Sequence, residues 1–285
     1  MFRGPGGQAA SNFSELTGGG GRQMPATIDI SHVSKAFVKA GQPLKVLDDV
    51  SISVEEGEFV ALIGPSGCGK STILNMVAGL IAPDVGHLHY EGLAINAVNT
   101  AVGYMTQSDS LLPWRTVEGN ISAALDIQRI ETHEKQRRVL EAIETVDLVG
   151  FEKHRPHELS GGMRKRVLLA RTLIYNPATL LMDEPFGALD ALLRLVMQEE
   201  LLRIWNNDRR TVVYVTHDLS EAITLADRVI VFSRRPGRVV LDQRIDLPRP
   251  RIADSLRTSA EFLKIYEQLW STIRLEVASP TDPQS

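Results

Sequence analysis

A glycine-rich segment between a strand-sized apolar run and a helical run constrains the fold of this chain more than any other feature. Residues 59–63 are all apolar and have the length of a buried strand. The sequence Gly-Pro-Ser-Gly-Cys-Gly-Lys-Ser follows at 64–71, and a helical stretch is expected from 71 to 80. These eight residues match the pattern G-x-x-x-x-G-K-[ST] in its required context of strand, loop and helix. The segment therefore predicts a loop that binds the phosphates of a nucleotide.

The residue types in this loop suit the chemistry of phosphate binding. Backbone N–H groups converge on phosphate oxygens only where side chains do not obstruct them, and the helix N-terminus adds positive potential. Lys70 would carry a full charge to the β- and γ-phosphates, and Ser71 would offer a hydroxyl to Mg²⁺. The predicted nucleotide contacts in this segment are Gly64, Pro65, Ser66, Gly67, Cys68, Gly69, Lys70, Ser71 and Thr72.

Strand and helix patterns alternate along most of the chain. Further strands are expected at residues 28–37, 46–54, 87–90, 102–105, 179–182, 211–215 and 228–232. Helices are expected at 191–205 and 219–226, and the periodicity from about 117 to 175 is mostly helical. This alternation predicts a mainly parallel α/β sheet with a helical insertion.

Composition excludes several classes of protein. The chain has 285 residues, of which 43% are hydrophobic and 23% charged, as is usual for a globular protein. It contains no apolar run of the 18 residues that a membrane-spanning helix needs. The net charge of −4 argues against general nucleic-acid binding, and the single cysteine favours a reducing compartment.

Two further motifs suit a nucleotide site. The apolar strand at 179–182 is followed by Asp183 and Glu184, where one carboxylate suits Mg²⁺ and the next suits a general base. The sequence Leu-Ser-Gly-Gly-Met at 159–163 opens a helix. Ser160 would cap this helix, and Gly161 and Gly162 leave its first amides bare, which makes a second anion site.

Together these motifs resemble the nucleotide-binding domain of ABC transporters, from about residue 27 onward. The resemblance implies a P-loop NTPase (RecA-like) core with an antiparallel β subdomain and an inserted helical subdomain at about 108–176. It implies an ATPase domain over 25–246, which follows a glycine-rich tail at 1–24 and precedes a linker and helix at 247–285. The implied ligands are ATP and Mg²⁺.

The resemblance also assigns roles to single residues. Glu184 would be the general base, while His217 and Lys70 would contact the γ-phosphate. Asp183, Ser71 and Gln107 would surround Mg²⁺.

Other roles follow from the same resemblance. Phe37 stands where the family usually has a tyrosine that stacks on adenine, and Asp190 falls in the D-loop at the dimer interface. In a head-to-tail dimer of two copies, Ser160, Gly161 and Gly162 would close on the ATP held by the other copy.

The residues around these motifs are similar to those in the ATPases of nitrate, sulfonate and taurine importers. The similarity lies in residues 110–117, in the LSGGM form, and in 233–238 and 247–251. It implies two transmembrane permease subunits, an extracytoplasmic solute-binding protein, no nucleic acid, and a peripheral place on the cytoplasmic face of the inner membrane. Two alternatives stay open: a soluble ABC ATPase acting on a macromolecular assembly, such as one for iron–sulfur assembly, and a nucleotide-binding regulator without catalysis.

Overall fold

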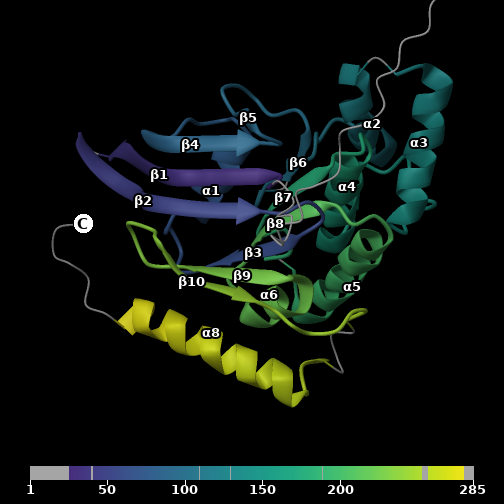
Figure 1. Cartoon of the computed structure of the whole chain (residues 1–285). Coiled ribbons are helices and arrows are strands. Elements are labelled where there is room, and N and C mark those ends of the chain that lie inside the picture. The colour runs from purple at the N-terminus through teal and green to yellow at the C-terminus, as the bar shows by residue number, and fades with distance from the viewer. Residues whose placement is uncertain are drawn as a thin grey trace, which may run out of the picture.

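Two β-sheets organise the computed structural model of the chain, which describes residues 26–39, 41–108, 110–128, 130–187, 189–251 and 256–278 (Figure 1). The larger sheet has six strands in the order β10-β9-β3-β8-β7-β6. Their bounds are β3 Phe59–Ile63, β6 Val102–Met105, β7 Thr179–Asp183, β8 Thr211–Val215, β9 Arg228–Phe232 and β10 Val239–Arg244. All neighbouring strands run parallel except β10 on β9, so the predicted mainly parallel sheet is confirmed. The tail expected at 1–24 lies outside the described residues.

The smaller sheet is antiparallel, with the order β2-β1-β4-β5. Its strands are β1 Ile28–Lys39, β2 Gln42–Val54, β4 Val85–Tyr90 and β5 Leu93–Ala94. The first two strands extend beyond their predicted bounds of 28–37 and 46–54, because backbone pairing between them continues to Lys39 and Gln42. The short strand β5 and the polar edge strand β10 were not predicted, since neither has a run of apolar residues long enough to mark it.

Helices cover both faces of the larger sheet. Helix α1 (Lys70–Val77) contacts β4 of the small sheet and also β7 and β8, so it lies between the two sheets. Helices α4 (Gly161–Leu173), α5 (Ala191–Asn207) and α6 (Leu219–Leu225) belong to the other side. Helices α2 (Val117–Gln128) and α3 (Thr132–Thr145) pack on α4, and a short 3-10 turn spans Pro156–Glu158. None of the helices in these described ranges is long and apolar enough to cross a membrane.

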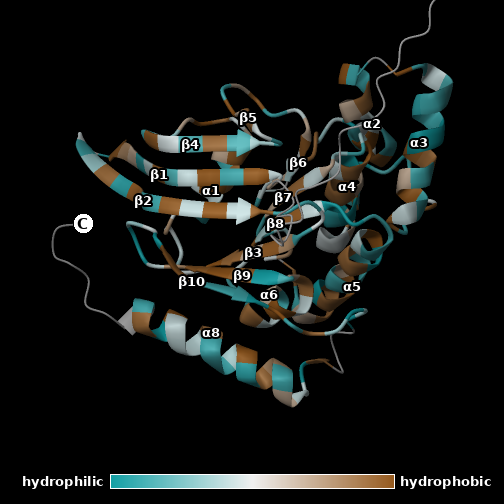
Figure 2. Ribbon diagram, viewed as in Figure 1, coloured by the Kyte–Doolittle hydropathy of each residue, from teal (hydrophilic) through white to brown (hydrophobic). Residues whose placement is uncertain are grey.

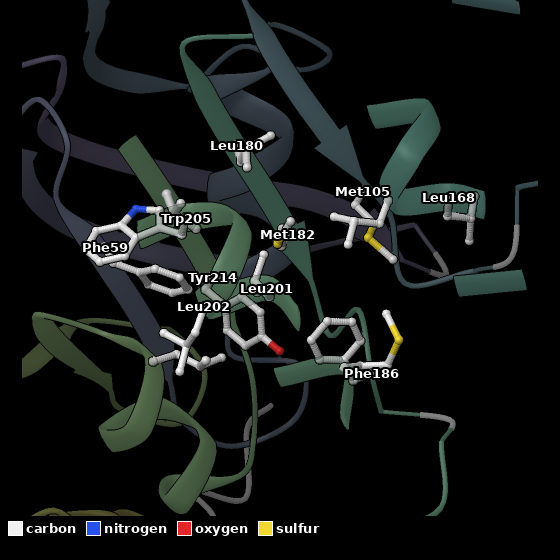
Figure 3. Packing of buried hydrophobic residues seen from close by; sticks show 14 of the residues in the cluster. Phe59, Met105, Leu168, Leu180, Met182, Phe186, Leu201, Leu202, Trp205 and Tyr214 are labelled. Carbon is white, nitrogen blue, oxygen red and sulfur yellow. The ribbon is translucent and has the colours of Figure 1, made fainter. Parts of the chain in front are cut away.

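Strand β3 separates two hydrophobic cores. All five of its residues are buried, and because side chains alternate along a strand they point to opposite faces. Phe59 contributes to the core under α4, α5 and α6, where it packs edge-on against Trp205 with ring centroids 5.7 Å apart (Figure 3). Val60 contributes to the core around α1 and the small sheet. The apolar colouring of the central strands in Figure 2 reflects this burial on both faces.

The C-terminal helix α8 (Ala260–Ala278) packs on α6 and β9 through one face. Phe262 and Leu269 are buried, and Tyr266 and Ile273 are partly buried against the same core. This is the face that the spacing of apolar residues predicts, at i, i+4, i+7 and i+11.

The segment interpreted as a linker at 247–251 is anchored by a buried arginine. The Arg251 side chain is only 6% exposed and donates to backbone carbonyls at the end of α6 and after β10. The shortest of these bonds, 2.6 Å, goes to Ala226 O. Burial lowers the pKa of the guanidinium to about 10, so it remains charged at neutral pH and suits the negative end of a helix.

We expect Arg251→Ala to lower the free energy of unfolding by about 3 kcal/mol, because several buried carbonyls lose their donor. Arg244→Ala, which removes an exposed arginine at the end of β10, serves as the matched control and should change the value by less than about 0.5 kcal/mol. Urea denaturation of the two variants measures both values. Equal stabilities would contradict an anchoring role.

Candidate nucleotide-binding site

The glycine-rich loop joins the end of β3 to the start of α1 and brings its backbone close to neighbouring elements. Gly64 has φ 150°, and a Cβ there would lie 2.7 Å from Phe232 O. Gly69 caps the N-terminus of α1 without a side-chain hydrogen bond, so the first amides of the helix stay available to an anion.

Lys70 is buried beneath this loop. Its side chain is 6% exposed, and Nζ donates to Gly64 O at 2.8 Å and to Pro65 O at 3.0 Å. Both partners are backbone carbonyls rather than carboxylates. The positive charge therefore remains available to a phosphate bound by the loop.

Ser71 and Asp183 form the part of the site suited to Mg²⁺. Ser71 Oγ donates to Asp183 Oδ1 at 3.0 Å, which joins the start of α1 to the end of β7. Burial raises the pKa of the Asp183 carboxyl, the bond from Ser71 opposes this rise, and the charge of Glu184 adds to it. Mg²⁺ prefers such oxygen ligands and usually takes its remaining ones from water and substrate phosphates. A hydroxyl and a carboxylate at this distance fit that chemistry.

Three polar side chains converge where neighbouring parallel strands end. Gln107 follows β6, Glu184 follows β7 and His217 follows β8. Glu184 Oε2 accepts a hydrogen bond from Gln107 Nε2 at 3.2 Å and lies 3.4 Å from His217 Nδ1. Carboxyl ends of parallel strands share one edge of the sheet, so residues far apart in sequence become neighbours there.

A pocket of about 530 Å³ unites most of these groups. Its lining comprises Val46, Ser66, Gly67, Gly69, Lys70, Ser71, Thr72, Gln107, Glu184, His217 and Arg235. The pocket lining does not include three other residues of the loop, Gly64, Pro65 and Cys68. Asp183 does not line the pocket either, but it contacts the lining residue Ser71 through a hydrogen bond.

Comparisons with known proteins decide the family. A family model described as ABC transporter matches residues 47–187. The aliphatic sulfonates import ATP-binding protein SsuB of Bacillus cereus is 42% identical over 233 residues, which span 81% of this chain and 92% of that protein. The chain belongs to the ABC transporter family. The taurine import ATP-binding protein TauB of Rhizobium johnstonii is 41% identical and aligns with 85% of this chain and 94% of its own length.

The ABC fold is also found among solved structures. A dimeric structure of a post-hydrolysis state of the ATP-binding cassette MJ0796, bound to ADP and Pi, has a TM-score of 0.69. It is 29% identical and aligns with 78% of this chain and 100% of its own. The resemblance and the fold class predicted from sequence are confirmed.

The remaining predicted residues of this ABC chain lie outside the pocket. Ser160 Oγ accepts from Met163 N at 3.2 Å and caps α4, and Asp190 Oδ1 accepts from Leu193 N at 3.0 Å and caps α5. Gly162 fits closely beneath Leu193, because a Cβ on this glycine would lie 2.5 Å from Leu193 Cδ2. These two helix starts are thus packed together, away from the pocket of their own chain.

Phe37 is also absent from the pocket lining. It lies on β1 opposite Leu44, is 40% exposed, and has Lys35 Nζ at 5.7 Å from its ring centroid.

Two lining residues, Val46 and Arg235, were not predicted. Val46 comes from β2 of the small sheet, and Arg235 comes from the turn between β9 and β10. In the sequence, residues 233–238 serve only as a sign of family resemblance. Nothing in their pattern predicts that this turn packs against the phosphate loop.

A larger pocket of about 730 Å³ lies elsewhere, near the start of β1 and the loop before β8. Its charged lining mixes acids such as Glu56 and Asp208 with Arg209 and Arg210. None of the predicted site residues belongs to it, so we assign the nucleotide to the pocket at the phosphate loop.

We expect Gly64→Ala to lower the free energy of unfolding by about 3 kcal/mol and to weaken ATP binding, because the new methyl group meets a backbone oxygen. Gly92→Ala is the control. Gly92 also has a positive φ, of 76°, but a Cβ there has no neighbour within 4 Å, so we expect a loss of about 1 kcal/mol. Thermal unfolding and nucleotide titration separate the two. Equal losses would show that the close approach to Phe232 has no effect.

Proposed function

We propose that this chain is the ATP-hydrolysing subunit of an importer, which couples ATP binding and hydrolysis to uptake of a small solute through separate transmembrane subunits. The observation that carries the proposal is that Gln107, Glu184 and His217 converge in the pocket lined by the phosphate loop. The import ATP-binding proteins SsuB and TauB, similar over most of their length, support the coupling to import.

Glu184 is the proposed general base. Its carboxylate would accept a proton from a water molecule as the water oxygen attacks the γ-phosphorus and the bond to the ADP oxygen breaks. Gln107 Nε2 and His217 Nδ1 both lie near Glu184 Oε2, so they would orient the water and contact the γ-phosphate.

The proposed ligands of Mg²⁺ are Ser71, Asp183 and Gln107, which would hold the ion beside the phosphates that Lys70 would contact. Mg²⁺ bound there supplies positive charge that stabilises the phosphate oxygens.

The proposed working unit is a head-to-tail dimer. Ser160, Gly161 and Gly162 start α4 outside the pocket of their own chain, and the amides of a capped helix start suit a phosphate. In a dimer these residues would complete the ATP site of the other copy, with Asp190 at the interface. The dimeric structure of the similar cassette MJ0796 supports the proposal that this chain forms a dimer.

The proposed partners are two permease subunits and, through them, an extracytoplasmic solute-binding protein. The chain would sit peripherally on the cytoplasmic face of the inner membrane. Trp114, which is 69% exposed near the start of α2, suits contact with an apolar segment of a permease. The proposed solute is of the nitrate, sulfonate or taurine type, and the names of the relatives support the sulfonate and taurine members of this group.

We expect Glu184→Gln to lower ATP turnover at least about 100-fold while ATP binding persists, because the amide keeps the shape but accepts no proton. The variant should accumulate as an ATP-bound dimer, which light scattering with and without ATP detects. Lys70→Ala is the contrasting variant and should lose tight ATP binding. Near-normal turnover by Glu184→Gln would refute the assignment of the base.

We expect the tagged chain to co-purify with a multi-spanning membrane protein from native membranes solubilised in mild detergent, since the proposed function requires permease subunits. Mass spectrometry identifies the partner, and Trp114→Ala should reduce its recovery. Recovery of cytosolic partners alone would leave the ATPase chemistry intact but favour an ATPase that acts on a macromolecular assembly.

A further inference from the structure

The turn between β9 and β10 places an arginine next to the phosphate loop. Arg235 donates to Gly67 O from Nε at 3.1 Å and from Nη2 at 2.9 Å. Both residues line the pocket that holds Lys70 and Glu184. Gly67 belongs to the glycine-rich motif, whereas Arg235 lies 168 residues further along the chain.

Backbone contacts fix this turn against the phosphate loop. Gly237 N donates to Val46 O at 2.8 Å, and Gly237 O accepts from Asp48 N at 3.0 Å. A Cβ on Gly237 would lie 2.0 Å from Cys68 O, so the turn approaches the loop as closely as only a glycine permits. The backbone of this turn, which carries Arg235, is therefore positioned by its contacts with β2 and with the phosphate loop.

Arg235 adds a second permanent positive charge to the pocket lining. Lys70 is the first, and it is buried beneath the loop with bonds to Gly64 O and Pro65 O. The Arg235 side chain is exposed, and within the described part of the chain its Nη1 group has no hydrogen-bond partner. A guanidinium has five N–H donors in a planar fork that matches phosphate oxygens. Arg235 thus has donors left for a phosphate while it is held by Gly67.

Its place along the loop indicates which phosphates it meets. Gln107, Glu184 and His217 mark the γ-phosphate end of the pocket, and no hydrogen bond or ion pair in the described residues joins Arg235 to any of them. Arg235 contacts Gly67 instead, which belongs to the loop whose backbone amides cradle the α- and β-phosphates.

We propose that Arg235 is a nucleotide-binding residue of this ATPase and that it contacts the phosphates that ATP and ADP share. The proposal rests on the proposed ATP-binding function. It assigns to the β9–β10 turn a direct part in holding the nucleotide, by a charge-assisted hydrogen bond to an α- or β-phosphate oxygen.

Arg235→Ala tests the proposal. We expect the Kd values for ATP and for ADP, titrated calorimetrically without Mg²⁺ to prevent turnover, to rise by a similar factor of about ten, as for a lost charge-assisted hydrogen bond. The difference from the unchanged chain should shrink as KCl is raised, since a part-exposed charge is screened by salt. Arg235→Lys keeps the charge without the planar fork and should lose less affinity than the alanine variant.

Arg244→Ala is the matched control, because it removes one arginine from the far end of the same hairpin, outside the pocket. Its Kd values should equal those of the unchanged chain. Equal Kd values for Arg235→Ala and Arg244→Ala would overturn the proposal, and so would a loss confined to ATP.

Thermal melting without nucleotide distinguishes a phosphate contact from a purely structural role of Arg235. If Arg235→Ala and Arg235→Lys lose the same affinity and both melt earlier without nucleotide, the arginine only stabilises the turn, and the proposal fails. If the unchanged chain binds neither ATP nor ADP, the proposed function fails first, which is a different result from an unchanged Kd in the variant.

Discussion

A positive charge buried beneath a bare backbone loop is the constraint on which the site depends. Lys70 Nζ is bonded only to the carbonyls of Gly64 and Pro65 and to the Cys68 sulfur in the described residues, without an ion-paired carboxylate. An ammonium group removed from water without a counter-charge is costly, and a bound phosphate supplies that charge. The loop that covers it is held by β3, which is buried on both faces, and by the first turn of α1. The two hydrophobic cores on either side of β3 therefore hold in place the loop on which the proposed ATP binding depends.

The parallel sheet contributes the second half of the site through its strand order. Because β6, β7 and β8 are neighbours and run in one direction, the residues that follow them meet at one edge. Gln107, Glu184 and His217 come together there although they are distant in sequence. Glu184 adopts a φ of 44°, and its backbone N donates to Val215 O at 3.0 Å, so the turn after β7 is fixed by β8. Glu184, the proposed base, is thereby positioned by backbone contacts, which leaves its carboxylate to interact with Gln107 and His217.

Arginines connect the later elements to this core. Arg251 holds the segment after β10 against the end of α6, and Arg235 holds the β9–β10 turn against the phosphate loop. Arg234 N in the same turn donates to Glu276 Oε2 of α8 at 3.4 Å. The C-terminal helix thus touches the turn that reaches the nucleotide pocket. This hydrogen bond links helix α8 physically to the candidate nucleotide site.

Local sequence determined much of this protein: the phosphate loop, the parallel strands, the capped start of α4 by Ser160 and the apolar face of α8. The loop, the cap and the helix face each depend on residues within about three turns of each other, and the parallel sheet follows from the alternation of strand and helix patterns along the chain, so residue types and spacing suffice to predict them. Only the tertiary structure decided the contacts between distant segments that no motif marks. The strand pairing between Lys39 and Gln42, the approach of Gly237 to Cys68, and the placement of Arg235 on Gly67 come from contacts between separate segments. An arginine in a turn has the same local pattern whether it faces water or a phosphate loop, and only packing of the sheets distinguishes the two.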